Sequence, residues 1–401
     1  MNLSDIDILD PDRYVTGVPY DQFELLRREA PVFWHHEPGG PGFWAITRHD
    51  DVVAIALDAK TFSSERGGTQ IPDLPKDDIR VSPDNLVTMD PPRHGRYRAL
   101  VASVFTPKSI DALKGFVTEV MTDILDRVAP LGRCDLVADI SAYLPATVIM
   151  KMVGVPAGDR AQIESWVKRL LSPDDPDFAS SPEDRASITQ QFMAYAHDLA
   201  KSRHQDPRDD LLSRLMAAEV NGATLTYEEF GMFFMLLLAA GTDTTRHLLA
   251  NGSLELLGHP EVLARLREDP ARWPGAVEEM LRLCPPMFHI RRTATRDCTV
   301  RGQKIEAGQK VVLWWVSANR DENVFPEPNT FDIDREPNNH MSFGHGPHSC
   351  LGNALARLQA RIAFAELFTR LPDMACDGPV QRLRSNWLNG VKKMPIRFSP
   401  P

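Results

Sequence analysis

The residue best suited to chemistry in this 401-residue chain is a cysteine, Cys350, near the end of a glycine-rich stretch. The stretch 343–352 reads FGHGPHSCLG. Cys350 is predicted to lie where a helix begins, where free N–H groups and the helix dipole favour a thiolate over a thiol. The helix is indicated by apolar residues that recur at helical spacing, namely Leu351, Leu355, Leu358, Ile362 and Ala365. Glycines let the backbone turn sharply and approach a bound group closely, and here they are Gly344, Gly346 and Gly352.

A thiolate in such a loop suits one axial position of a haem iron. Two other interpretations of the same residues stay open. One is a buried free cysteine, which is common in protein cores. The other is a zinc site, although zinc motifs usually bring Cys-x-x-Cys pairs and this sequence has none. Its ligands would be His340, His345, His348 and Cys350.

A second chemically active group lies inside a long apolar segment. The segment from about 226 to 257 opens with the capping-box pattern Thr226-x-x-Glu229 and ends before a Gly-His-Pro sequence, which predicts one helix on the order of 45 Å long. Its middle, 240–245, reads AGTDTT, a poor choice for a buried helix. Threonine hydroxyls can bond back to carbonyls four residues earlier and open the helix, and a buried acid needs a partner. A locally weak helix with a packed Asp–Thr pair would also give this pattern.

Two charged patterns are weak signals by themselves. His94 and Arg98 follow a double proline and lie four apart on one predicted helix face, as in many solvated basic faces. Glu279 and Arg282 lie three apart in a helix predicted to begin near Pro274, and surface pairs of this kind contribute little.

Taken in order, these stretches resemble the cytochrome P-450 family. The pattern Phe-Gly-x-Gly-x-His-x-Cys-x-Gly at 343–352 is similar to the family's haem-binding signature, and Ala-Gly-x-Asp-Thr at 240–244 is similar to the motif at its oxygen-binding groove. The similarity covers nearly the whole chain, from about residue 10 to the end. It implies a mainly α, single-domain fold over residues 1–401, helical with a small β-rich region, that binds haem b (iron protoporphyrin IX).

The resemblance also implies residue roles. Cys350 is expected to ligate the haem iron, and Asp243 with Thr244 to relay protons to iron-bound oxygen. The expected haem contacts are His94, Arg98, Ala240, Gly241, Arg292, His340, Phe343, Gly344, Gly346, His348 and Gly352, with His94, Arg98, Arg292 and His340 at the propionates. Five apolar residues are expected to line the substrate pocket, although each is as consistent with simple core packing. They are Met287, Phe288, Ile290, Trp387 and Leu388. Expected to brace the cysteine loop, without a part in catalysis, are Glu279, Arg282 and Arg335.

The implied activity is that of a haem-dependent monooxygenase. One oxygen atom from O2 would enter a C–H bond of a hydrophobic small molecule, and the resemblance is closest to members that act on steroid side chains, methyl-branched lipids or terpenoids. Because no reductase domain is expected in the chain, a separate ferredoxin with its NAD(P)H-dependent reductase is the expected electron donor. Two rivals stay open: a peroxide-driven peroxygenase, whose members lack the acid–alcohol pair, and a non-catalytic haem sensor or carrier.

Composition and charge limit the class of protein, its partners and its cellular location. A net charge of −10 makes nucleic acid an improbable partner, and 43% hydrophobic with 25% charged residues describes an ordinary soluble globular protein. Five cysteines at scattered spacings fit a reducing cytoplasm without disulfides. The acidic amino terminus and the lack of an uninterrupted run of about 18 apolar residues predict neither a signal peptide nor a membrane anchor. We therefore expect a cytoplasmic monomer.

The elements that must position these residues follow from local patterns. Short β-rich runs at 31–35 and 43–47 predict a hairpin. The Gly-, Pro- and Asp-rich stretch 67–85 predicts a long surface loop. Helical patterns cover 109–170 and 183–220, and the polar, Pro-rich segment 172–182 joins them. By resemblance, these helices roof the pocket and open to admit substrate.

Overall fold

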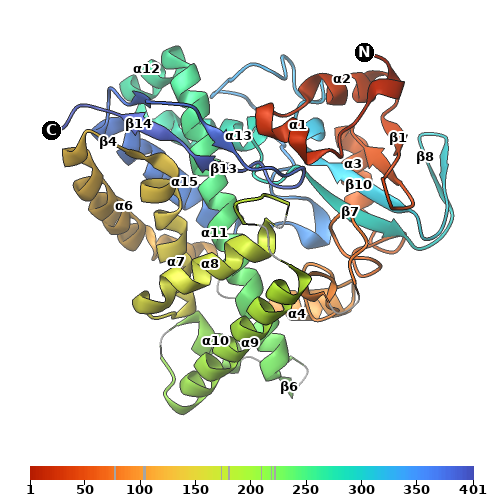
Figure 1. Ribbon diagram of the computed structural model, residues 1–401, viewed down its shortest axis with the longest axis horizontal. Coiled ribbons are helices and arrows are strands. Elements are labelled where there is room, and N and C mark those ends of the chain that lie inside the picture. Colours follow the sequence, from red (N-terminus) through yellow and green to blue (C-terminus); the bar gives the residue numbers. More distant parts are fainter. Residues whose placement is uncertain are drawn as a thin grey trace.

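The computed structural model describes residues 1–75, 78–102, 105–172, 174–178, 181–208, 210–217, 219–220 and 223–401. Helices make up most of the molecule, and a smaller β-rich part lies on the amino-terminal side (Figure 1). The described α-helices are α1 Pro11–Thr16, α2 Tyr20–Glu29, α3 His49–Leu57, α4 Arg93–Ala102, α5 Pro107–Asp111, α6 Lys114–Val128, α7 Tyr143–Val153, α8 Arg160–Leu171, α9 Pro182–Gln205, α10 Leu211–Ala217, α11 Tyr227–Gly258, α12 Pro260–Glu268, α13 Trp273–Leu283, α14 Trp315–Ala318 and α15 Asn353–Arg370.

The β-rich part is built around one mixed sheet in the order β1-β2-β10-β7-β3. The hairpin predicted from the sequence is confirmed as the antiparallel pair β1 and β2, with Phe33 opposite Ala45. β10 runs parallel to β2 and antiparallel to β7, so it joins residues more than two hundred positions apart. The described strands are β1 Val32–His35, β2 Phe43–Ile46, β3 Phe62–Ser63, β4 Arg133–Asp135, β5 Glu219–Val220, β6 Ala223–Thr224, β7 His289–Ala294, β8 Cys298–Val300, β9 Gln303–Ile305, β10 Lys310–Trp314, β11 Ala375–Cys376, β12 Gln381–Arg382, β13 Val391–Lys393 and β14 Pro395–Arg397.

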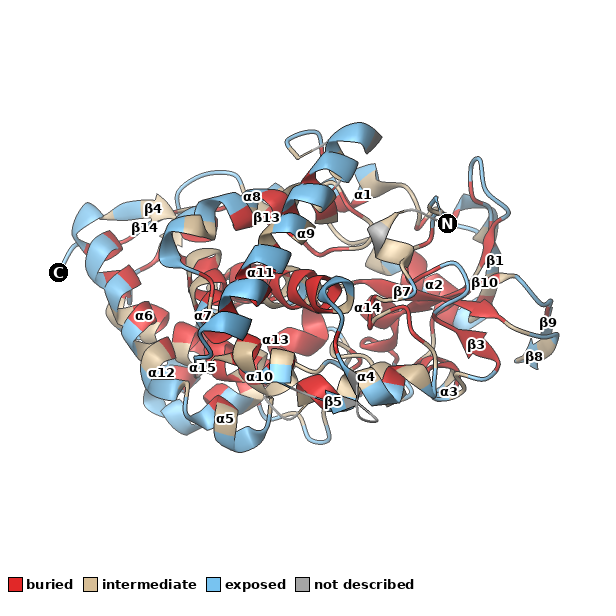
Figure 2. Ribbon diagram, turned by 90° about the horizontal axis from the view of Figure 1, so that it is seen from below, coloured by how far each residue is buried: buried red, intermediate tan, exposed pale blue. Residues whose placement is uncertain are grey.

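Helix α11 is the long helix that the sequence predicts. Its 32 residues begin after Thr226, whose hydroxyl accepts from the Glu229 N–H while the Glu229 carboxylate accepts from the Thr226 N–H. This reciprocal capping box fixes the first turn. The helix runs through the middle of the molecule, and much of its ribbon is buried (Figures 1 and 2). It therefore gives the surrounding helices a common apolar axis.

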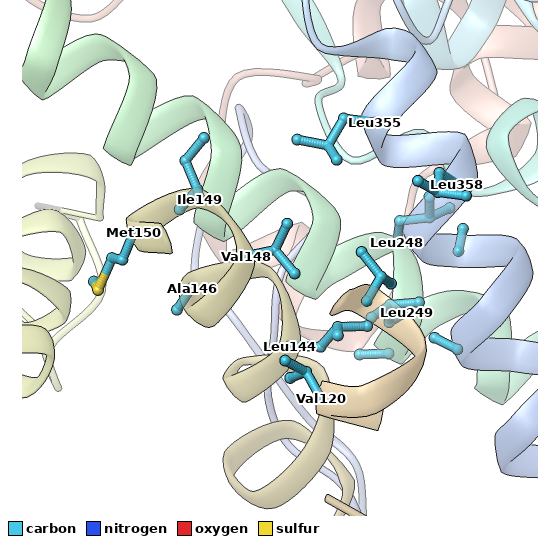
Figure 3. Packing of buried hydrophobic residues seen from close by; sticks show 14 of the residues in the cluster. Val120, Leu144, Ala146, Val148, Ile149, Met150, Leu248, Leu249, Leu355 and Leu358 are labelled. Carbon is cyan, nitrogen blue, oxygen red and sulfur yellow. The ribbon is translucent and has the colours of Figure 1, made fainter. Parts of the chain in front are cut away.

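The main core forms where α6, α7, α11 and α15 meet. Figure 3 shows Val120 of α6, Leu144 and Val148 of α7, Leu248 of α11 and Leu358 of α15 in this region. All five are buried, and burying such a side chain stabilises the fold by about 1.5–3 kcal/mol. The core fixes α11 against α15, the two helices that carry the predicted chemistry.

The helical pattern predicted for 109–170 is interrupted in the structure. After α6, Gly132 adopts a left-handed conformation with φ 69°, and β4 then pairs with β14 near the carboxy terminus. A π-helical turn, Leu136–Ser141, leads into α7. Pro130 and Gly132 punctuate the sequence at this point, so the apolar residues that follow belong to a new element.

Among the described residues, one helical segment, Leu136–Val153, is long and apolar enough to cross a membrane by length and composition alone. Its mean hydropathy is 1.5, and 67% of it is buried inside the protein. It packs against α6 and α11, as the core helix of a soluble protein would.

Candidate active site

A cavity of about 350 Å³ separates the middle of α11 from the loop that carries Cys350. Cys350, Phe343 and Gly352 line one side, and Ala240 with Thr244 of α11 line another. The stretches that the sequence singled out therefore face one common space. Because ligand pockets are usually concave, mostly apolar and equipped with a few convergent polar groups, this cavity is the candidate active site.

The cysteine loop is held in shape by its own backbone. The Cys350 N–H donates to the Phe343 carbonyl at 2.7 Å, and the Ser349 N–H donates to the Gly346 carbonyl at 3.0 Å. Gly344 and Gly346 adopt φ values of 67° and 70°, which other residues rarely adopt. A Cβ on Gly346 would also lie 2.8 Å from the Ala56 carbonyl oxygen. Glycine is thus required at both positions.

Gly352 needs a different explanation. Its φ is −85°, and a Cβ placed on it would meet no atom within 4 Å. The space beside it belongs to the cavity, so a bound group could approach the backbone closely at this point. Gly352 also caps α15, which begins at Asn353, two residues after the predicted apolar pattern.

The thiol of Cys350 opens into the cavity while protein surrounds it on its other sides. Burial raises the pKa of the Cys350 thiol, and the Gly352 N–H together with the guanidinium groups of Arg98 and Arg357 opposes this rise. Burial therefore opposes the thiolate that the helix start favours. A metal cation bound to the sulfur would produce the thiolate, because a coordinating thiol is deprotonated outright.

Three basic side chains line one end of the cavity, namely His94, Arg98 and His348, and the charge of Arg292 acts on both histidines from nearby. The His94 and His348 rings lie 4.0 Å apart, and Arg98 Nη2 donates to the Ser349 carbonyl at 2.6 Å. In the described part of the chain, neither Arg98 nor Arg292 forms an ion pair with a carboxylate. Arg292 is only 4% exposed, and burial lowers its pKa to about 10, against the opposing charge of Asp90. Positive charge is gathered here, and the single carboxylate of Asp90 offsets only part of it.

The same accumulation of charge affects the two histidines. Burial, reinforced by Arg98 and Arg292, lowers the pKa of His94 to about 4. Burial lowers the pKa of His348 to about 2, and the nearby Arg292 and His94 add to this effect. Both imidazoles are therefore neutral near pH 7 and can donate one hydrogen bond each.

His340 does not belong to this basic group. Its Nε2 lies 3.2 Å from Glu278 Oε2, and its Nδ1 accepts from the Ser342 N–H at 3.3 Å. It is also absent from the cavity lining. Burial alone would raise the pKa of Glu278, but its partners His340 and Arg357 lower this pKa to about 2. The propionate contact expected for His340 is therefore wrong in this structure, and His348 occupies the cavity-facing position instead.

These observations fit a haem. A thiol faces the cavity, unpaired cations stand where two propionate carboxylates would be neutralised, and glycine backbone leaves room beside the sulfur. Charge-assisted hydrogen bonds to such carboxylates are roughly twice as strong as neutral ones. No group of three or more metal-binding side chains that could hold an ion occurs among the described residues, and these include all four proposed zinc ligands. The zinc interpretation is therefore excluded.

On α11, the threonines bond back to the helix as their residue type suggests. Thr242 Oγ1 donates to the Leu238 carbonyl at 2.8 Å, and Thr244 Oγ1 donates to the Ala240 carbonyl at 2.7 Å. The lone pairs of the Thr244 oxygen remain free to accept a hydrogen bond from a group in the cavity. At Gly241, a Cβ would come within 2.9 Å of the Ile149 side chain, so a larger residue would force that side chain of α7 to move.

Asp243 has partners that the sequence did not identify. Its Oδ1 lies 3.3 Å from Arg246 Nη2, three residues on, while its Oδ2 is buried without any hydrogen-bond partner among the described residues. A void of about 10 Å³ adjoins it, lined also by Glu164 and Lys168 of α8. Burial, with help from Arg246, lowers the pKa of Lys168, while Glu164 and Asp243 oppose the change. A buried acid thus stands between the cavity and a small void that α8 also lines.

Most of the expected pocket residues line the cavity. Met287, Ile290, Trp387 and Leu388 do so, and Met287 forms a β-bridge with Leu388. Phe288 does not. It is 1% exposed, packs against Tyr14 and belongs to the core on the other side of the sheet, facing away from the side to which its neighbour Met287 turns. The substrate contact expected for Phe288 is therefore wrong.

The predicted triad Glu279, Arg282 and Arg335 does come together. Arg282 Nη2 lies 2.6 Å from Glu279 Oε1 with neither side chain exposed, and Arg335 Nε lies 3.0 Å from the same oxygen. Arg282 also donates to the carbonyls of Asn319, Pro328 and Thr330. The triad fastens the chain that leads into the cysteine loop, which agrees with the expected bracing role.

The sequence did not indicate a buried ion pair that joins the connection after α8 to β13, which we call the latch. Asp175, in the connection between α8 and α9, is fully buried and lies 3.0 Å from Lys392 Nζ of β13. It also accepts from the Arg384 N–H at 2.9 Å. The acidic sequence of this connection suggested only a polar loop, because its partner lies more than two hundred residues away.

A family model described as Cytochrome P450 matches residues 13–272 and 274–376 of the chain. The chain therefore belongs to the cytochrome P450 family, whose members bind haem through a cysteine thiolate. It is a cytochrome P450 monooxygenase of a single-domain fold.

Similar proteins come from several bacteria. The steroid C26-monooxygenase of Rhodococcus jostii (strain RHA1) is 34% identical, over 98% of this chain and 84% of the relative. The linalool 8-monooxygenase of Pseudomonas putida is 35% identical, over 98% of this chain and 99% of the relative. The solved structure of Mycobacterium marinum cytochrome P450 CYP268A2 in complex with pseudoionone aligns with a TM-score of 0.91 and 34% identity over 98% of each chain.

Proposed function

We propose that this monooxygenase hydroxylates an unactivated C–H bond in a branched hydrophobic small molecule of the steroid, methyl-branched lipid or terpenoid class. The observation that carries the proposal is the cavity between Cys350 and Thr244, because its walls are mostly apolar. Relatives named for a steroid and for linalool support the substrate class.

Five residues of the chain would hold the cofactor. Cys350 would supply the thiolate ligand, and Arg98, Arg292, His94 and His348 would hold the propionate carboxylates. When bound, haem with a thiolate ligand supplies the oxygen chemistry, because the thiolate pushes electron density in the direction that favours O–O cleavage. The protein contributes the position of the substrate and the delivery of protons.

The apolar walls would hold the substrate and exclude water. Met287, Ile290 and Leu388 contact the cavity from one side, and Val167 and Leu170 of the roof helix α8 contact it from another. Dry surroundings strengthen every electrostatic interaction inside the site and suppress side reactions.

Protons would reach the cavity through Asp243 and Thr244. The free Oδ2 of Asp243 can exchange a proton with water in the adjoining void, and Arg246 keeps the carboxylate in place. Thr244 already donates to the Ala240 carbonyl, so its oxygen accepts a hydrogen bond from the cavity and holds a protonated group there. Positioned proton transfer contributes roughly 10²–10⁴-fold.

The electron donor that we propose is a separate ferredoxin with its NAD(P)H-dependent reductase, acting on a monomeric, cytoplasmic enzyme. The intact Asp243–Thr244 pair favours this oxygen-dependent cycle over a peroxide-driven one, since peroxide brings its own protons. A haem protein that only stored or sensed a ligand would have no use for the pair.

The test is turnover with a ferredoxin, its reductase, NADPH and ¹⁸O2 on a panel of steroids, methyl-branched lipids and terpenoids. We expect at least one product that carries a single ¹⁸O atom and depends on NADPH. Product formed equally well from hydrogen peroxide without reductase would contradict the proposal, and so would a lack of ¹⁸O in every product.

A further inference from the structure

The stretch 69–87 gives the cavity three polar side chains that neither haem binding nor proton delivery uses. Thr69, Gln70 and Asn85 line the cavity, where this part of the wall also includes Leu86, Val87 and Arg80. Thr69 and Asn85 are each only 9% exposed. A small polar corner thus interrupts an apolar surface.

The orientation of both amides is fixed by hydrogen bonds to their oxygens. Gln70 Oε1 accepts from Arg80 Nη1 at 3.0 Å, and Arg80 is itself held by Asp78 through two bonds of 2.9 and 2.7 Å. Asn85 Oδ1 accepts from the Val87 N–H at 3.1 Å. The NH2 groups are therefore the free ends of both side chains.

Among the described residues, neither NH2 group has a hydrogen-bond partner, and the Thr69 hydroxyl has none either. An unpaired donor is costly once a bound ligand has displaced water from it, so a ligand that brings an acceptor gains relative to one that does not. A site built to hydrogen-bond a ligand group also discriminates against an analogue that lacks it.

The charge of the corner decides which acceptor fits. The Arg80 guanidinium is neutralised by its bidentate pairing with Asp78, and Gln70 and Asn85 are uncharged. A neutral oxygen therefore matches this corner better than a carboxylate, whose burial needs a free cation. A carbonyl oxygen, which has two lone pairs and no hydrogen of its own to place, is the best match for two N–H donors.

We propose that Gln70 and Asn85 form a subsite for the carbonyl oxygen of a ketone substrate, so that oxidation falls on the hydrocarbon part of the same molecule. This inference rests on the proposed function and narrows its substrate class to branched ketones. Gln70 and Asn85 are specificity-determining residues in this account, and they take no part in oxygen chemistry.

The test compares ketones with hydrocarbons of the same skeleton. The probes are geranylacetone and cholest-4-en-3-one, each beside the hydrocarbon in which CH2 replaces the carbonyl group. Binding to the haem-loaded protein is measured by the shift of the Soret band and by calorimetry. We expect at least one ketone to bind roughly five- to tenfold more tightly than its hydrocarbon, the gain of about one hydrogen bond.

Two variants separate the subsite from general packing. Asn85→Asp and Gln70→Glu keep the oxygen that accepts from Val87 or Arg80 and replace the free NH2 with an acceptor oxygen. Each variant should weaken ketone binding by roughly tenfold and should reduce the preference over the hydrocarbon. Gln191→Glu, an exposed position on α9, makes the same chemical change away from the cavity and should leave the preference intact.

The outcomes are distinct from those that test the monooxygenase itself. NADPH-dependent incorporation of ¹⁸O reports the proposed function, whereas ketone preference reports the subsite. Native protein that binds neither ketone more tightly than its hydrocarbon, including a failure to bind any probe, overturns the subsite. An unchanged preference in a folded Asn85→Asp or Gln70→Glu protein, judged by an intact carbon monoxide spectrum, overturns it as well.

Discussion

Arg246 Nη2 lies 3.3 Å from Asp243 Oδ1, one turn along the same buried helix, and leaves Asp243 Oδ2 without a partner. The carboxylate is thus only half satisfied, although both side chains are at most 6% exposed. The adjoining void can supply the missing partner as a water molecule. An acid held in this way can gain and lose a proton without leaving its place.

Replacing Asp243 with asparagine should slow the whole catalytic cycle. Asparagine keeps the size of the side chain but cannot shuttle a proton, so turnover should fall by roughly 10²–10⁴-fold. Product formed per NADPH should stay near the native ratio, and the solvent deuterium isotope effect on turnover should grow. A native turnover rate in Asp243→Asn would show that protons enter by another path.

Replacing Thr244 with alanine should uncouple the cycle instead of stopping it. The cavity would lose the hydroxyl oxygen that accepts a hydrogen bond, and reduced oxygen would leave as hydrogen peroxide while NADPH is still consumed. Product, peroxide and NADPH are to be measured together, with Thr244→Ser as the control that keeps the hydroxyl. Native product yield per NADPH in Thr244→Ala would make the residue merely structural.

The basic end of the cavity should decide how well haem is retained. Arg98→Leu should lower haem occupancy, because one propionate would lose a charge-assisted partner. The double variant Arg98→Leu, Arg292→Leu should lower it further, with the thiolate spectrum of the remaining holoprotein unchanged. Arg96→Leu, an exposed arginine on the same helix, is the matched control. Full occupancy in the double variant would refute the propionate assignment.

The latch between Asp175 and Lys392 should control how fast ligands enter and leave. Lys392→Met would leave the buried carboxylate unpaired and weaken the closed roof, and each 1.4 kcal/mol lost corresponds to a tenfold change. We expect 4-phenylimidazole to dissociate roughly tenfold faster in stopped-flow measurements. Asp177→Asn changes an exposed neighbour that also pairs with Lys392, and it should have little effect. Equal rates in the native and Lys392→Met proteins would remove the latch from the account.

Local sequence signals predicted much of the fold. The capping box at Thr226 placed the start of α11 within one residue, because a helix end is decided by its own few side chains. The β1–β2 hairpin followed from two short runs and a turn in the same way. The break at Gly132 was overlooked because apolar residues continue on both sides of it, and the pairing of β4 with β14 depends on residues at the far end of the chain.

Within the site, motif spacing placed residues well only where the backbone allows one arrangement. The Glu279–Arg282–Arg335 triad assembled as expected. Phe288 and His340 were misplaced because spacing alone does not say toward which side an extended chain turns each side chain. The Asp243–Arg246 pair has the same spacing of three residues as Glu279 and Arg282, so its spacing could have indicated it. Lys168 and the Asp175–Lys392 latch act through tertiary contacts, so no local pattern indicated them.

The ligation of haem iron by Cys350 is the central claim, and the carbon monoxide difference spectrum tests it most directly. Reduced native protein with carbon monoxide should absorb near ~450 nm, as thiolate ligation implies. Cys376→Ala, which removes another exposed cysteine, should keep that band, whereas Cys350→Ala should lose it while the protein remains folded. A band near ~450 nm that persists unchanged in Cys350→Ala would contradict the account.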